Sequence, residues 1–192
     1  MNSELIRKDF PILETKVNGY PVVYFDNGAT TQRPLPVMRA VMDYVTRNNG
    51  NPHRGAHIFA MSASEAYDTS KTVIKDFIGA KSEKEIIYTR NTSESLNLVA
   101  RSYGETHLKK GDRILIPVSE HHSNLVPWQR AAKKTGAVLE YMYVDKETGR
   151  LSEGELKKID DPRVKILAFA QVSNVLGLSI DARALIRRAH KH

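Results

Sequence analysis

A run of polar and ring-bearing side chains, Ser119-Glu120-His121-His122-Ser123-Asn124, is the part of this sequence best suited to chemistry. It follows the apolar run 113–117, which predicts a buried strand, and it precedes the amphipathic run 125–134, which predicts a helix. Open α/β sheets bind their ligands where strands end and helices begin. We therefore expect a ligand site at this junction.

A second junction, Asn91-Thr92-Ser93-Glu94, places two hydroxyls at the start of a predicted helix, directly after a predicted strand at 85–89. Free backbone N–H groups and the helix dipole favour an anion there, and the hydroxyls of Thr92 and Ser93 add donors, so phosphate is the natural ligand. The alternative is an ordinary helix cap, a role that Thr and Ser fill in many helices. Neither Gly-x-x-x-x-Gly-Lys nor Gly-x-Gly-x-x-Gly occurs, so the segment is not a P-loop or a dinucleotide motif.

A third junction, Ser173-Asn174-Val175-Leu176-Gly177, lies just past a predicted strand at 164–170. The neutral amide of Asn174 can hydrogen-bond a ligand oxygen without adding charge, although Asn and Gly are also common turn residues. Because three polar strand ends converge on one edge of the sheet, together they predict a cofactor pocket.

The adjacent imidazoles of His121 and His122 suggest a metal at first sight. Neighbouring residues at a strand end point in opposite directions and rarely serve one ion, and no carboxylate pair or His-Glu-x-x-His helix supports them. We expect no metal. Two interpretations stay open: a plain polar loop, or one imidazole that packs against a flat heteroaromatic ring and passes protons.

Composition limits the class of protein. The chain has 192 residues, 41% apolar and 27% charged, which suits one sizeable domain. It has no cysteine, which excludes disulfides, thiolate metal sites and a cysteine nucleophile within this stretch. No apolar run approaches the roughly 20 residues of a membrane span, and no secretory signal is visible, so we expect a cytoplasmic protein without membrane contact.

The net charge of +7 raises the question of a nucleic-acid partner. The basic residues are scattered in pairs such as Lys109-Lys110 and Arg187-Arg188, without a run of five and without interleaved aromatic residues. This pattern indicates a solvated surface and no nucleic acid, with an acidic partner as the alternative.

The elements that must position these residues follow from periodicity, caps and glycines. Helices are predicted at 35–44, from Ser62 to about Phe77, at 92–103, at 125–134, at 152–159 and from Asp181 on. Two of them open with capping boxes, Ser62-Ala63-Ser64-Glu65 and Ser152-Glu153-Gly154-Glu155. Strands are predicted at 85–89, 113–117, 138–144 and 164–170.

Strand–helix alternation from residue 85 onward predicts an α/β fold with a mostly parallel sheet covered by helices. Residues 1–60 are expected to form a loop-rich arm, and residues 61–192 the first part of a larger α/β domain. The last predicted helix has no stop signal and no following strand to cover. We therefore expect the chain to be a fragment.

Two loop segments combine glycine with polar groups: Asp26-Asn27-Gly28-Ala29-Thr30 and His53-Arg54-Gly55-Ala56-His57. Each is weak evidence alone, but in order with the three junctions they resemble one family. From about Phe10 to His192 the chain resembles the N-terminal half of the class V aminotransferase-fold cysteine desulfurases, most closely the Suf-type group that includes selenocysteine lyases. The run from Glu120 to Gln129 is highly specific to that group, and the other segments are moderately so.

The resemblance implies a three-layer PLP-dependent transferase fold of type I, incomplete in this chain, and pyridoxal 5′-phosphate (PLP) as the cofactor. It implies that Thr92 and Ser93 lie at the cofactor phosphate, that His121 stacks on the pyridine ring and assists proton transfer, and that Asn174 hydrogen-bonds the phenolic oxygen. Further site residues are implied on the substrate side and near the mouth of the site and the dimer contact: Asn27, Gly28, Ala29, His53 and Arg54.

The chain departs from the family at Ser93 and Ser95, where relatives often have Thr and Gly, and at Gln171, where they often have His. The change at Ser93 keeps a hydroxyl. The pyridine-pairing Asp, the Schiff-base Lys, the sulfur-accepting Cys and the carboxylate-binding Arg of the family fall beyond the position that His192 reaches. The resemblance therefore implies a front half that does not turn over substrate alone.

The activity implied is removal of sulfur from L-cysteine, giving L-alanine and a persulfide for iron–sulfur cluster assembly. The implied partners are a Suf-type sulfur-acceptor protein and, when complete, a second copy in a homodimer. Two alternatives stay open: selenocysteine lyase or another enzyme of the same fold, and a truncated, non-catalytic protein that binds a partner.

Overall fold

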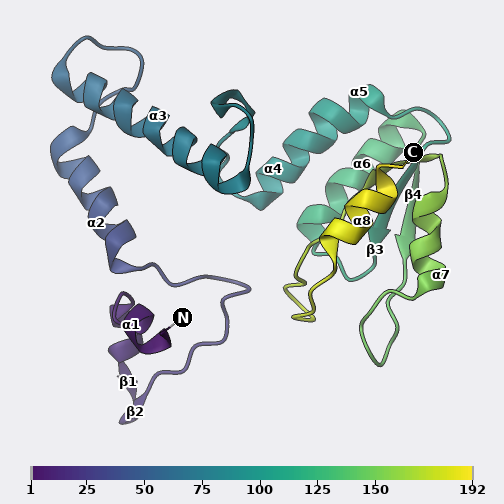
Figure 1. The fold of residues 1–192 in the computed structure, drawn as a ribbon, viewed down its shortest axis with the longest axis horizontal. Helices are drawn as coiled ribbons and strands as arrows, with labels where there is room; N and C mark the ends of the chain where they lie inside the picture. Colours follow the sequence, from purple (N-terminus) through teal and green to yellow (C-terminus); the bar gives the residue numbers. More distant parts are fainter. Residues whose placement is uncertain (1, 192) are drawn as a thin grey trace. The chain divides into compact units, whose positions relative to one another are not determined.

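The computed structural model describes residues 2–191 (Figure 1). The chain forms two compact units, one up to Tyr88 and one from Thr89 on. The sequence expectation placed a boundary after residue 60, a position that falls inside the long helix α3 (Ile58–Ile78). Within the described residues, no helix has both the length and the apolar character needed to cross a membrane.

The first unit is mainly helical. Its elements in chain order are α1 (Ser3–Arg7), the 3₁₀ turn η1 (Pro11–Glu14), the antiparallel pair β1 (Lys16–Val17) and β2 (Tyr20–Pro21), α2 (Leu35–Asp43), the π-turn η2 (Tyr44–Asn48), α3 and the 3₁₀ turn η3 (Glu83–Glu85). The prediction of a helix at 35–44 is confirmed.

Helix α3 begins earlier than predicted. His57 is its N-cap, with Nδ1 accepting the backbone N–H of Ala60 at 3.4 Å, so the predicted start at Ser62 is wrong. Ser64, a member of the supposed capping box, instead accepts the N–H of His53 (2.8 Å) and donates to the carbonyl of Ala60 (2.7 Å). The predicted end is confirmed, because Gly79 closes the helix with φ of 71°, a conformation that glycine adopts without strain.

The predicted strand at 85–89 is wrong. Glu83–Glu85 forms the 3₁₀ turn η3, and residues 86–89 are extended without a strand partner in the part of the chain that the structure describes. Ile86 is buried and Ile87 is exposed. A strand also needs a neighbour to pair its backbone groups, and the pattern alone does not reveal one.

The second unit holds a parallel sheet in the order β4-β3-β5, as predicted for an α/β fold. Its strands are β3 (Arg113–Pro117), β4 (Val138–Met142) and β5 (Val164–Leu167), the last shorter than the predicted 164–170. Ile114, Leu115 and Ile116 of the central strand are fully buried. A strand covered on both faces requires such an unbroken apolar run.

Helices cover both faces of this sheet. On one face α6 (Val126–Thr135) packs Trp128, Ala131 and Ala132 against Ile114 and Ile116. On the other face, Leu115 packs with Ile159 of the 3₁₀ turn η6 (Lys157–Asp160), which follows α7 (Glu153–Leu156), and with Leu185 of α8 (Ala182–Ala189).

The predicted ends of these helices are mostly confirmed. Gly136 closes α6 with φ of 77°, Ser152 caps α7, and Asp181 caps α8 by accepting the N–H of Ala184 at 3.0 Å. The predicted helix 92–103 is α4 (Thr92–Val99) continued by the π-turn η4 (Ala100–Gly104) and by α5 (Glu105–His107). The strands thus place 118–125 and 168–181 at one edge of the sheet, where both carry candidate site residues.

Candidate functional site

The start of helix α4 is capped by Asn91, whose Oδ1 accepts the backbone N–H of Glu94 at 2.9 Å. The carboxylate of Glu94 accepts the N–H of Arg90 (2.7 Å) and pairs with its guanidinium (3.2 Å), which lowers the pKa of Glu94. Thr92 and Ser93 are therefore not the cap, and their backbone N–H groups meet no acceptor among residues 2–191. These two N–H groups remain available to an anion.

Ser93 and His121 are joined through a third residue, Ser123. The hydroxyl of Ser123 lies 2.8 Å from the hydroxyl of Ser93 and 2.8 Å from Nδ1 of His121. The backbone N–H of Ser123 also points at this Nδ1 at 3.1 Å. Because a backbone N–H can only donate, Nδ1 acts as the acceptor and the proton of the neutral ring lies on Nε2.

The loop that carries this cluster is fixed by a buried polar network. One oxygen of Glu120 accepts the backbone N–H of Ala170 at 2.8 Å, and the other accepts Nδ2 of Asn124 at 2.8 Å. Oδ1 of Asn124 accepts the indole N–H of Trp128 at 3.0 Å. Asn124 is 9% exposed and is the one buried residue with a charged or amide side chain in the described chain. Sequence reasoning did not select Glu120, Ser123 or Asn124.

Asn174 lies in a turn beyond β5, between the bridged residues Val172 and Ser179. The hydroxyl of Ser173 shapes the turn by accepting the N–H groups of Val175 (3.3 Å) and Leu176 (3.0 Å). The side chain of Asn174 is exposed and makes no hydrogen bond to any described residue. It follows the same strand end as Ala170, but it does not touch the cluster of Ser93, Ser123 and His121.

Asn27, Gly28 and Ala29 belong to the first unit and form an exposed turn. The N–H groups of Ala29 and Thr30 both donate to the carbonyl of Asp26 at 3.1 Å. The turn is local, and it presents the amide of Asn27 to solvent.

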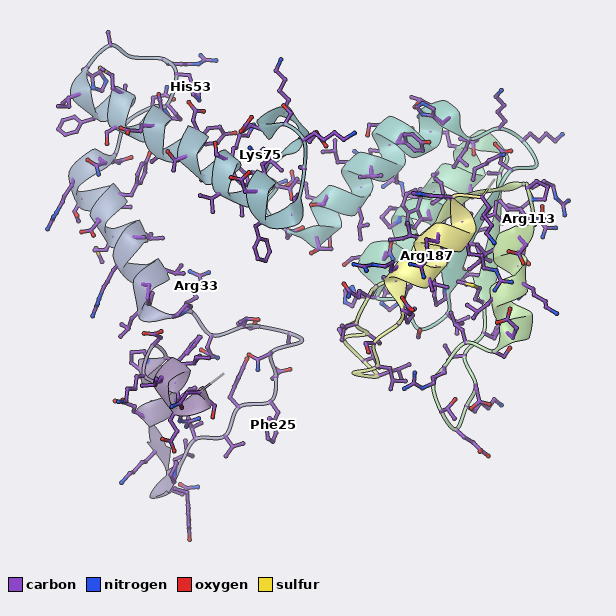
Figure 2. All side chains as sticks on the ribbon, viewed as in Figure 1. Phe25, Arg33, His53, Lys75, Arg113 and Arg187 are labelled. Carbon is purple, nitrogen blue, oxygen red and sulfur yellow. The ribbon has the colours of Figure 1, made fainter. Side chains whose placement is uncertain are left out.

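His53, also in the first unit, has a φ of 61°, which is uncommon for a residue other than glycine (Figure 2). Its ring packs edge-to-face with the ring of Tyr67, with 5.6 Å between the two ring centroids, and its Nε2 lies 3.5 Å from a carboxylate oxygen of Asp68. These contacts, with the N–H bond to Ser64, hold the unusual backbone in place. Arg54 follows it and is exposed.

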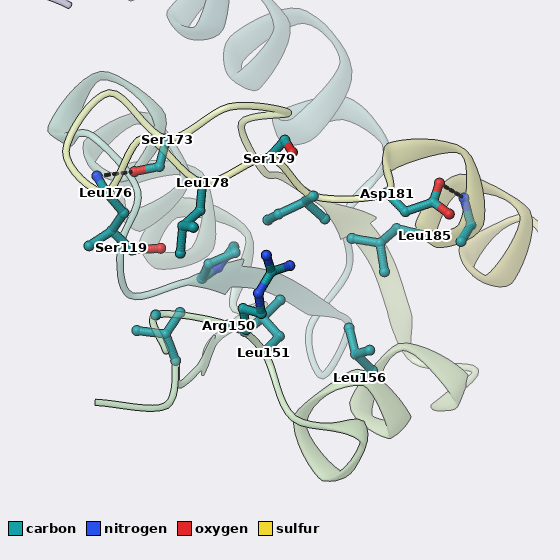
Figure 3. A pocket seen from close by; sticks show the side chains of 15 residues that line it. Ser119, Arg150, Leu151, Leu156, Ser173, Leu176, Leu178, Ser179, Asp181 and Leu185 are labelled. Carbon is teal, nitrogen blue, oxygen red and sulfur yellow. Dashed lines mark hydrogen bonds between the residues drawn. The ribbon is translucent and has the colours of Figure 1, made fainter. Parts of the chain in front are cut away.

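A cavity of about 250 Å³ lies on the α7 and α8 side of the sheet, beyond the end of β3 (Figure 3). Leucine is the most frequent residue in its lining, and Arg150 is the lining residue with a cationic side chain. Ser173 and Asp181 also line it, but each already accepts backbone N–H groups of its own turn or helix. The N-terminus of α4, with its hydroxyls and imidazole, is therefore the better candidate for a polar ligand.

Comparison with known proteins gives the chain a family. The model of the class V aminotransferases matches residues 23–192. A probable cysteine desulfurase of Halalkalibacterium halodurans is 44% identical over 192 residues, covering 100% of this chain and 47% of the relative. A probable cysteine desulfurase of Synechocystis sp. is 44% identical over 186 residues, covering 97% and 44%. The chain thus spans about half the length of the curated relatives it matches.

The solved structures that resemble this chain are also cysteine desulfurases. A cysteine desulfurase from Thermococcus onnurineus, in its apo form, has a TM-score of 0.88 and 40% identity, over 100% of this chain and 46% of that one. A cysteine desulfurase from Escherichia coli has a TM-score of 0.81 and 33% identity, again over 100% and 46%.

Proposed function

This chain belongs to the class V aminotransferase family, and from that premise we propose that it provides the front half of the PLP site of a cysteine desulfurase. The observation that carries the proposal is the cluster of Ser93, Ser123 and His121 at the start of α4. It supplies hydroxyls, two backbone N–H groups that meet no acceptor among residues 2–191, and the exposed imidazole of His121, which follows the end of the parallel strand β3.

The donor set suits the cofactor. A phosphate needs N–H and O–H donors at a helix N-terminus, which Thr92 and Ser93 supply. An aromatic ring needs a flat partner, which the imidazole of His121 supplies. When bound, PLP acts as an electron sink for the substrate carbon.

The protein's own groups then have separate tasks. Thr92 and Ser93 anchor the phosphate. Ser123 fixes Nδ1 of His121, so that the ring keeps one orientation and presents Nε2 for holding or moving a proton. Asn174, with no hydrogen bond to any residue in 2–191, has an amide free to bind the phenolic oxygen. The family resemblance assigns Asn27, Gly28 and Ala29 to the substrate side and His53 and Arg54 to the mouth of the site.

For the whole protein we propose removal of sulfur from L-cysteine, giving L-alanine and a persulfide that a Suf-type acceptor protein receives for iron–sulfur cluster assembly. We further propose a homodimer in the cytoplasm. The support for these finer assignments is the run from Glu120 to Gln129, which resembles the Suf-type group.

The test uses two proteins: the 192-residue chain, and the same chain joined to the C-terminal half of the Halalkalibacterium relative. With PLP, L-cysteine and a thiol reductant that releases the persulfide sulfur as sulfide, the joined protein should release alanine and sulfide, and the 192-residue chain should release none. The intact relative is the positive control. If the joined protein binds PLP but releases no alanine, the proposed activity is wrong; if it binds no PLP, the cofactor site is wrong.

The same two proteins separate the rival functions. Release of selenide from L-selenocysteine without release of sulfide from L-cysteine favours a selenocysteine lyase. A joined protein that folds, binds no cofactor and still binds an acceptor protein favours the non-catalytic alternative.

A further inference from the structure

The carboxylate of Glu120 connects the two loops that carry the proposed ring contacts. Glu120 immediately precedes His121, and its Oε1 accepts the N–H of Ala170, which lies past the end of β5 and four residues before Asn174. Its Oε2 accepts from Asn124, whose own N–H donates to the carbonyl of His121 at 2.8 Å. One side chain therefore sets the separation of two loops that are some fifty residues apart in sequence.

The direction of every hydrogen bond in this network is determined. The indole N–H of Trp128 can only donate, so Asn124 must turn Oδ1 toward it and Nδ2 toward Glu120. The backbone N–H of Ala170 can also only donate. Position 120 must therefore offer two acceptors and no donor, which a carboxylate does and an amide of the same shape does not.

We propose that Glu120 is a positioning residue that holds His121 and the loop leading to Asn174 at the spacing the cofactor ring requires. The inference rests on the proposed PLP function. The start of α4 would hold the phosphate, whereas the ring would lie between the loops 118–125 and 168–181. Among residues 2–191, the bond from Ala170 to Glu120 is the one hydrogen bond that joins these two loops. Small changes in the spacing of the two loops weaken cofactor binding and slow proton transfer, because both depend on geometry within fractions of an ångström.

The network can be broken and rebuilt by exchanging its donor and acceptor. Glu120→Gln turns an amide N–H₂ toward the N–H₂ of Asn124, and Asn124→Asp turns a carboxylate toward the carboxylate of Glu120. In the double variant Glu120→Gln/Asn124→Asp, the new amide at 120 donates to the new carboxylate at 124. The N–H groups of Ala170 and Trp128 keep their acceptors, and the total charge is unchanged.

The joined protein and its variants are titrated with pyridoxine 5′-phosphate, which has the ring and the phosphate but no aldehyde to react with lysines. Each single variant should bind it about tenfold more weakly, the scale expected for a lost hydrogen bond to a charged group. The double variant should recover most of that loss. Inorganic phosphate, which needs only the α4 end, should bind all four proteins equally.

Two controls separate positioning from stability. Trp128 is the sole tryptophan, so its indole N–H gives one NMR signal that reports the network directly. Glu105→Gln, which removes a partly buried carboxylate paired with the exposed Lys134, should leave that signal and both affinities unchanged.

The outcomes are distinct. Single variants that shift the indole signal and yet bind the analogue like the unaltered chain would show a purely structural network and overturn the proposal. A folded double variant with the indole signal restored and the affinity still lost would also overturn it. If the joined protein without substitutions binds inorganic phosphate but not the analogue, the proposed cofactor function fails, and the positioning role fails with it.

Discussion

His121 is oriented by its own loop, since the hydroxyl and the backbone N–H of Ser123 both point at Nδ1. The opposite nitrogen, Nε2, is exposed with the ring and can exchange a proton with a ligand. This geometry separates two tasks. We propose that Thr92 and Ser93 hold the phosphate and that His121 moves protons.

We predict that His121→Ala, in the joined protein, retains PLP but slows turnover of L-cysteine by about 10²–10⁴-fold, the usual contribution of a general acid–base group. The cofactor stays because the contacts at its phosphate are untouched. Steady-state alanine release and the absorbance of the bound cofactor measure the two effects. His122→Ala is the matched control, because no hydrogen bond involves the His122 side chain among residues 2–191. If His121→Ala turns over L-cysteine at an unchanged rate, His121 is not a general acid–base group in this reaction.

The sequence led to Thr92, Ser93 and His121 because their segments, taken in order with the others, resemble one family, although a helix cap or a polar loop would explain each segment alone. It did not lead to Ser123 or Glu120. Their partners lie 30 and 50 residues away, at Ser93 and Ala170, and no local pattern encodes contacts over such separations.

Elements were predictable where their signals are local. Gly79, Gly136, Ser152 and Asp181 each end or begin a helix as predicted, because a cap acts within one turn. The start of α3 was missed because the imidazole of His57 caps it, whereas Ser62-Ala63-Ser64-Glu65 lies inside the helix. The strand predicted at 85–89 is absent from the structure, because pairing is a property of two segments and not of one.

Ion pairs connect the start of β3 with the residues just before β5. Asp161 pairs with Arg163 at 2.7 Å and with Arg113 at 3.3 Å, and Arg113 also bonds Glu140 of β4 at 2.7 Å (Figure 2). The hydrogen bonds from Arg163, with a further contribution from the charge of Arg113, hold the pKa of Asp161 well below its usual range. All three strands of the sheet meet at this network.

A pH dependence of stability follows. Because the pKa of Asp161 is depressed in the folded chain, its stabilising contribution is present above the ordinary value of about 3.9 and is lost as the pH falls below it. Asp161→Asn should therefore lower the urea midpoint at pH 6, and the difference from the unaltered chain should shrink from about pH 4 downward. Glu147→Gln is the control, since Glu147 is exposed and forms no ion pair in the described residues. A difference that is constant with pH would exclude the ion pairs as its cause.

At the scale of the whole molecule, the family predicted from the sequence motifs is confirmed by the match over residues 23–192 and by relatives at 44% identity. The α/β fold is confirmed as well. A few motifs sufficed because the run from Glu120 to Gln129 is specific.

Large apolar side chains are exposed in both units, including Phe25, Phe77 and Val175, which are 93%, 86% and 74% exposed. Exposed apolar surface of this extent promotes association. We predict that the 192-residue chain binds the dye ANS and self-associates in sedimentation, whereas the joined protein does so less. A sharp two-state melt of a monomeric 192-residue chain without ANS binding would contradict this.

Covalent attachment of PLP tests which half of the protein supplies the lysine that binds the cofactor and which half supplies the phosphate site. Attachment needs a lysine placed by the phosphate site and an acidic partner for the pyridine nitrogen. The chain supplies the proposed phosphate site at Thr92 and Ser93, and none of its lysines lies in the family's Ser-x-His-Lys context. Protonated surface amines are poor nucleophiles.

Mixing PLP with the 192-residue chain should therefore give weak, heterogeneous labelling that dialysis removes. The joined protein should show one stable visible band with one cofactor per chain. Thr92→Ala/Ser93→Ala in the joined protein should weaken that band, because the phosphate anchor loses both hydroxyls. A stoichiometric, dialysis-resistant band from residues 1–192 alone would mean that one of its own lysines holds the cofactor, and the site would then have to be rebuilt around that lysine.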